Sequence, residues 1–142
     1  MSSQPEKITA IFILEAMGRP KEHLKEALQE LIDAMKKEKG VKVNEFKINE
    51  PTLLKDQKDL FTTFTEIEIE VEGPEHLAGL MFKYMPAHIE VIEPENLKIS
   101  NNVYSDILSE ITRKLHKYDE VARVIQMEKQ VLENKIKELE KK

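Results

Sequence analysis

The spacing of apolar residues changes several times along the first part of the chain. Short stretches that are rich in β-branched and aromatic residues, or that alternate apolar with polar residues, predict strands. Apolar residues that recur every three or four positions predict helices. Strands are predicted over residues 7–17, 41–48, 60–73 and 87–94, and helices between Pro20 and Gly40, where the glycine ends the helix, and over 74–85. The predicted order of elements is therefore β-α-β-β-α-β.

Two of the predicted strands carry further information. In the strand over residues 41–48 the apolar face changes between Val43 and Phe46, and this change of phase predicts a β-bulge near Asn44–Glu45. The strand over residues 60–73 alternates glutamates with isoleucine and valine. Since successive side chains of a strand point to opposite faces, one face of this strand should be buried and the other solvated.

The element order predicts an α+β fold of the ferredoxin-like kind, in which two helices cover one face of an antiparallel sheet. We expect this domain over residues 6–95. The first strand is apolar on both faces, because Ile11 and Ile13 point away from the predicted core, and Phe64 lies on the polar side of its own strand. Either a central strand is simply apolar on both sides, or a partner subunit or the start of the C-terminal segment covers the second face.

The C-terminal segment has a different pattern. No glycine or proline follows Pro94, so a single helix is predicted over residues 102–140, and it would be roughly 60 Å long at ~1.5 Å per residue. Residues spaced alternately by three and four positions form a heptad seam, which predicts a coiled-coil oligomer interface. The seam consists of Leu108, Ile111, Leu115, Tyr118, Ala122, Ile125, Lys129, Leu132, Ile136 and Leu139. The alternative is a single amphipathic helix lying on its own domain.

The seam predicts self-association without defining its geometry. Isoleucine at the d positions, Ile111 and Ile125, is unfavourable in parallel dimers, whereas Lys129 at an a position favours a dimer. In a parallel pair the charged flanking positions would form two attractive pairs and one repulsive pair, which leaves the orientation open. Valines at positions 121, 124 and 131 widen the apolar face, as expected for a larger bundle or for a groove that binds another protein.

A second candidate partner surface lies on the predicted helix over residues 74–85. Phe82 and Met85 extend its apolar circumference beyond an ordinary core stripe, and methionine-rich surfaces serve adaptable recognition. Together with Ile11, Ile13 and Phe64 they are the residues that we expect to contact a partner protein. The competing interpretation is that the helix is apolar because it packs in the core.

Composition narrows the classes of partner and chemistry. The net charge is −5 and no basic block occurs, so a nucleic acid is an unfavourable partner. Cysteine is absent, and no apolar run is long enough for a membrane span, which together suit a cytoplasmic protein. The four histidines are scattered, and no phosphate-binding loop or nucleophile motif occurs. We therefore expect no cofactor, no metal and no catalytic residue.

The segments "GRPKEHLKEAL", "EKGVKV", "MPAHIEVIEPE" and "LHKYDEVA" resemble uncharacterised small archaeal proteins. Those proteins pair a ferredoxin-like domain with a C-terminal coiled-coil helix, and the resemblance implies the same architecture here. It implies no activity and no site residues. The residues themselves favour a non-enzymatic, homo-oligomeric assembly or adaptor protein. The alternative is an ACT-like module that senses a small molecule, and an unrecognised enzyme is the least supported class.

Overall fold

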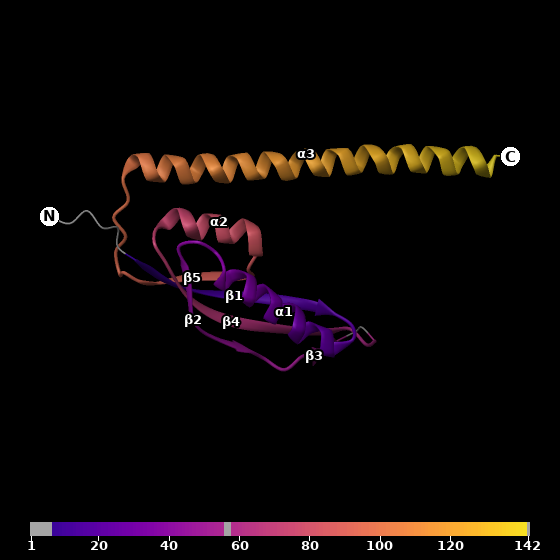
Figure 1. Ribbon diagram of the computed structural model, residues 1–142. Coiled ribbons are helices and arrows are strands. Elements are labelled where there is room, and N and C mark those ends of the chain that lie inside the picture. Colours follow the sequence, from indigo (N-terminus) through magenta and orange to yellow (C-terminus); the bar gives the residue numbers. More distant parts are fainter. Residues whose placement is uncertain (1–6, 56–57, 142) are drawn as a thin grey trace. The chain divides into compact units, whose positions relative to one another are not determined.

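The computed structural model describes residues 7–55 and 58–141 of the chain. Residue 6, the first residue of the expected domain, and residues 56–57 lie outside the described part. The chain divides into two compact units, residues 1–100 and residues 101–142. The elements are β1 (Ile8–Gly18), α1 (Lys21–Lys36), β2 (Val41–Ile48), β3 (Thr52–Leu53), β4 (Phe61–Val71), α2 (Pro74–Tyr84), β5 (His88–Glu93) and α3 (Asn101–Glu140). They make a mixed α+β protein with a long C-terminal helix (Figure 1).

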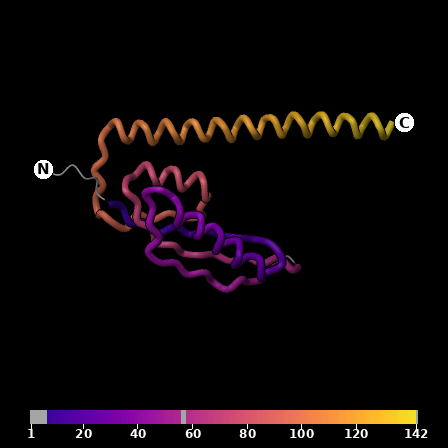
Figure 2. Tube along the Cα trace, in the orientation of Figure 1, coloured from indigo at the N-terminus to yellow at the C-terminus, as the bar shows by residue number. Residues whose placement is uncertain are grey.

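The first unit contains one antiparallel sheet. Its strand order is β2-β4-β1-β5, and the two-residue strand β3 pairs with β4 beyond the end of β2. The chain path in Figure 2 shows α1 and α2 as the connections that carry the chain between strands that are not neighbours in the sheet. The strands β1 and β4 are central, and they pair over their whole length from Ile8 with Val71 to Gly18 with Phe61.

A single apolar core lies on one face of the sheet. Alternate residues of β1 are buried, and they pack with buried residues of β4, α1 and α2 in one cluster. Both short helices therefore cover the same face. The largest fully buried apolar members of this core are Ile8, Phe12, Leu14, Leu28, Ile32, Met35, Ile67, Ile69 and Val71. Burial of this set supplies most of the driving force for folding of the unit, at about 25 cal/mol per Å² of apolar surface.

The predicted bulge in β2 is confirmed. The pairing of β2 with β4 shifts register between Val43 and Glu45, which leaves Asn44 as the extra residue. The Asn44 side chain donates a hydrogen bond from Nδ2 to Oε2 of Glu68, 3.2 Å away. The bulge brings Val43 and Phe46 onto the helix-covered side of the sheet, which explains why their spacing broke the alternation.

The end of α1 differs from the prediction. The helix ends at Lys36, four residues before Gly40, because Met35 is its last buried residue. Gly40 instead lies in the turn into β2 with φ of +77°. A Cβ atom added at Gly40 would lie 2.5 Å from Nε2 of His76, so this turn requires glycine both for its backbone conformation and for space.

Candidate functional site: the exposed seam of helix α3

Helix α3 extends over 40 residues and begins one residue earlier than predicted. Pairs of charged side chains one turn apart stabilise it locally: Arg123 with Asp119 at 3.0 Å and Lys129 with Glu133 at 3.9 Å. Such pairs contribute only about 0.3–0.5 kcal/mol each. Most of the stability of a helix in a protein comes from packing of its apolar face, so this helix needs a surface to pack against.

The seam of α3 is exposed. No residue of the helix is buried. Seven of the large apolar seam residues, Leu108, Leu115, Tyr118, Ile125, Leu132, Ile136 and Leu139, are between 44% and 70% exposed, and Ile111 is half-buried. Contiguous apolar surface of this extent is rare on a monomer and marks an interaction site.

The apolar arc of α3 extends beyond the seam on one side. Val121, Val124 and Val131 are all at least half exposed. An open groove of about 500 Å³ is lined by Val124, Met127, Glu128, Val131 and Leu132. With 3.6 residues per turn, these valines lie next to the d positions, whereas Lys129 lies at the opposite edge of the arc beside Glu133. The lysine therefore borders the apolar surface instead of dividing it.

The open face of the sheet contains the three β-strand residues of the expected partner surface. Ile11 lies between Glu68 of β4 and Glu90 of β5 in register, and Ile13 lies between Glu66 and His88. Both isoleucines are half-buried, and Phe64 is exposed. The result is a narrow apolar stripe with acidic side chains along most of its border.

The two α2 residues of that expected surface lie elsewhere. Met85, just after α2, is 69% exposed and has a left-handed backbone with φ of +49°, while Phe82 is half-buried. The helix packs through Leu80 and Tyr84 into the core on the other face of the sheet. The structure therefore does not bring Phe82 and Met85 together with the residues of the open face.

A polar cluster joins the end of α2 to the turn after α1. The hydroxyl group of Tyr84 donates a hydrogen bond to Oε1 of Glu38 at 2.9 Å, and Lys83 forms an ion pair with the same carboxylate. Burial, followed by the hydrogen bond to Glu38, raises the pKa of Tyr84 to about 12. The hydrogen bond from Lys83, followed by that from Tyr84, lowers the pKa of Glu38. The cluster was not predicted, because its partners lie more than 40 positions apart in the sequence.

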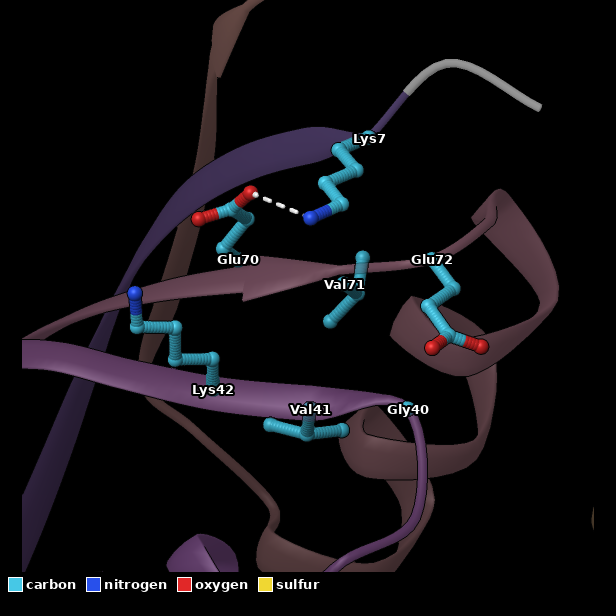
Figure 3. A pocket seen from close by; sticks show the side chains of 7 residues that line it. All are labelled: Lys7, Gly40, Val41, Lys42, Glu70, Val71 and Glu72. Carbon is cyan, nitrogen blue, oxygen red and sulfur yellow. Dashed lines mark ion pairs between the residues drawn. The ribbon is translucent and has the colours of Figure 1, made fainter. Parts of the chain in front are cut away.

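The hollows of the first unit are small and charged. One of about 180 Å³ lies where β1, β2 and β4 meet (Figure 3). Here the Lys7 ammonium lies 3.7 Å from a carboxylate oxygen of Glu70, and Lys42 lies opposite Glu70 in the register of β2 and β4. A second hollow of about 330 Å³ includes Glu38, His76 and Lys83 in its lining. The Nδ1 atom of His76 is buried there without a hydrogen-bond partner in the described part of the protein.

Metal ligands do not cluster in the described residues: no group of three His, Cys, Asp or Glu side chains could hold an ion there. Two of the three glutamates of β4 lie opposite lysines in the register of β2 and β4: Glu66 opposite Lys47, and Glu70 opposite Lys42. The third, Glu68, lies opposite Glu45 and accepts the hydrogen bond from Asn44. Within residues 7–55 and 58–141, no helix combines the length and the apolar character needed to cross a membrane.

The fold and the exposed helix define a two-unit α+β protein with a long C-terminal helix. The model of the MJ0538 family matches residues 9–142 of the chain, which therefore belongs to the MJ0538 family. This family is named for a Methanocaldococcus protein, which agrees with the resemblance to small archaeal proteins. No curated protein and no solved structure matches the chain.

Proposed function

We propose that this protein is a non-enzymatic, homo-oligomeric assembly or adaptor protein. Its α3 seam would form a coiled coil between copies, and the coiled coil would present the N-terminal domain for contact with another protein. The observation that carries this proposal is the long, regularly spaced apolar seam, in which seven of the eight large apolar residues are exposed. A surface of this kind on a helix with no buried residue is unfavourable in water unless a partner covers it.

We further propose that the N-terminal unit is a ferredoxin-like domain. The observation in favour is the strand order β2-β4-β1-β5, in which every neighbouring pair is antiparallel and both short helices cover one face. With β3 set aside, these elements follow the order β-α-β-β-α-β that defines the split βαβ arrangement. Domains of this kind present an open sheet face, which here carries Ile11, Ile13 and Phe64.

The seam is large enough for a stable interface. Burying one large apolar side chain removes roughly 60–120 Å² from water, as its contribution of about 1.5–3 kcal/mol at about 25 cal/mol per Å² implies. The eight large apolar seam residues would then bury roughly 500–1,000 Å² per helix. Specific protein interfaces bury about 800 Å² per partner. A second α3 helix therefore supplies enough contact area for association without help from the N-terminal domain.

A matched pair of substitutions tests the coiled coil. Leu132 lies in the seam and is 60% exposed, while Gln130 is exposed and lies outside both the seam and the groove beside it. Light scattering should show that Leu132→Lys weakens association at least tenfold, because it places a charge in the covered surface, whereas Gln130→Lys leaves the mass unchanged. Equal effects of the two variants would contradict the seam, since both side chains are exposed on α3.

A second candidate function is the ACT-like sensing of a small molecule. It is favoured by the buried Nδ1 atom of His76, which has no hydrogen-bond partner in the described part of the protein and lies 3.7 Å from a carboxylate oxygen of Glu75. This histidine lines the hollow near Glu38 and Lys83. A thermal-shift screen with amino acids and nucleotides tests this function, because a ligand at about 100-fold its dissociation constant adds about 2.7 kcal/mol of stability. A hit that His76→Ala abolishes would favour sensing over a purely structural role.

A further inference from the structure

We propose that α3 pairs with α3 of a second copy of this chain in the antiparallel direction, in a register centred between Arg123 and Val124. The inference rests on the proposed function, because it requires the seam to be a contact between copies. It adds the direction and the register of that contact, which the heptad spacing alone leaves open.

The order of residue types along the seam reads nearly the same from both ends. Leu, Ile and Leu occupy its first three positions, and Leu, Ile and Leu occupy its last three. An antiparallel pair about the midpoint places every seam residue level with another seam residue of the second copy. The levels are Leu108 with Leu139, Ile111 with Ile136, Leu115 with Leu132, Tyr118 with Lys129, and Ala122 with Ile125. This is the self-complementarity that a two-fold interface between identical chains requires.

Lys129 and the isoleucines at the d positions also favour the antiparallel direction. In a parallel pair Lys129 would lie level with its own copy, so two like charges would lie at the same level along the border of the seam. In the antiparallel register Lys129 lies level with Tyr118, whose ring face and hydroxyl oxygen both attract an ammonium group. Isoleucine at the d positions Ile111 and Ile125 is unfavourable specifically in parallel dimers. In an antiparallel pair the a positions of one helix pack against the d positions of the other, so the restriction on isoleucine at d positions does not apply.

The charged residues beside the seam favour the parallel direction, but they contribute less to the free energy of association than the seam residues do. In the antiparallel register Lys114 lies near Lys135 of the second copy, whereas the parallel register would place both lysines near carboxylates. All of these flanking positions are at the border of the contact, where solvent screens the charges and long side chains lose freedom on pairing. The seam positions are removed from water on association, so their mismatches cost more.

The proposed direction has a functional consequence. In this register the Asn101 ends of the two helices lie roughly 70 Å apart along the axis, at ~1.5 Å per residue. The two N-terminal domains would therefore be attached at opposite ends of the pair. Such an arrangement links two separate partner molecules, whereas a parallel pair would present both domains at the same end.

Distances between spin labels test the direction in the full-length protein. The chain contains no cysteine, so a single introduced cysteine carries the only label. Arg123, Gln130 and Lys137 are exposed, seven residues apart, and therefore on one edge of α3. Labels at Arg123→Cys, Gln130→Cys and Lys137→Cys should be separated along the axis by about 2, 20 and 40 Å, at ~1.5 Å per residue.

The possible outcomes separate the two proposals. Equal, short distances at all three positions would overturn the antiparallel direction while leaving self-association intact. A monomeric mass for the labelled proteins and for the unmodified chain would overturn both.

A pair of introduced charges gives an independent measurement of the direction. The double variant Leu115→Lys, Leu132→Glu should associate at least tenfold more tightly than the double variant Leu115→Lys, Leu132→Lys. In a parallel pair each new charge would face its own copy, and the two double variants would associate equally weakly.

Discussion

The Lys129 ammonium lies 3.9 Å from the Glu133 carboxylate, one turn further along α3. This ion pair holds the head group of the only charged seam residue at the edge of the apolar arc. The aliphatic part of the lysine can still cover apolar surface while its charge stays in water. The lysine is therefore compatible with a closed seam, at some cost in stability.

Replacing Lys129 measures that cost. We expect Lys129→Leu to raise the melting temperature, because a polar residue at an a position specifies the assembly state at the expense of stability. A gain of about 1 kcal/mol would shift the melting temperature of a chain of this size by roughly 2–6 °C. Light scattering of this variant should show a higher-order assembly if Lys129 limits the number of chains. Glu133→Gln is the control, and it should change stability by less than about 0.5 kcal/mol. An unchanged melting temperature and mass for Lys129→Leu would place this residue outside the seam.

The hydrogen bond between Tyr84 and Glu38 predicts a local loss of stability. Tyr84→Phe should destabilise the protein by about 1–2 kcal/mol in chemical denaturation, because it removes a hydrogen bond to a charged group from a buried side chain. Tyr104→Phe is the matched control: Tyr104 is 54% exposed, and its loss of a hydroxyl group should change stability by less than about 0.5 kcal/mol. Similar losses for both variants would show that the hydrogen bond to Glu38 contributes nothing specific.

The same cluster predicts how stability depends on pH. The pKa of Tyr84 is raised to about 12 in the folded state, so its contribution is fully present below the ordinary tyrosine pKa and is lost as pH rises through about 12. The pKa of Glu38 is lowered, so its contribution is present above the ordinary glutamate pKa and is lost as pH falls through the lowered folded-state value. Ultraviolet titration should show a phenolate transition near pH 12 that Tyr84→Phe removes. A transition that persists in the variant would assign it to another tyrosine.

Alanine substitutions at two glycines should change the stability of the N-terminal unit in opposite directions. Gly40→Ala should destabilise the N-terminal unit by more than about 1 kcal/mol, because φ is +77° and the new Cβ would lie 2.5 Å from Nε2 of His76. Gly79→Ala should stabilise it by about 0.5–1 kcal/mol, because Gly79 lies within α2 and a Cβ there meets nothing within 4 Å. Thermal unfolding measures both. Stabilisation by Gly40→Ala would contradict the geometry of this turn.

Much of the N-terminal fold could be predicted because its burial is periodic. Strict alternation of glutamate with isoleucine located β4, and the change of phase between Val43 and Phe46 located the bulge of β2. The end of α1 was predicted too late, at Gly40, because glycine commonly ends helices. The helix stops earlier, since none of its residues after Met35 is buried. The two-residue strand β3 is too short to have any period, and it fell within the predicted loop.

The candidate site, too, could be predicted only in part from the sequence. Heptad spacing is a local property of the sequence, so it identified the residues of α3 that form the seam, and the structure shows that most of them are exposed. The cluster of Glu38, Lys83 and Tyr84 depends on how α2 packs near the end of α1, which no local pattern encodes. The separation of Phe82 and Met85 from Ile11, Ile13 and Phe64 likewise depends on which face of the sheet α2 covers.

The mass of the full-length protein in solution tests the central claim most directly. Light scattering coupled to size exclusion, repeated over a hundredfold range of concentration, should give at least twice the chain mass of 16.5 kDa. A mass of 16.5 kDa at every concentration would show that α3 does not join copies of this chain, and it would contradict the account.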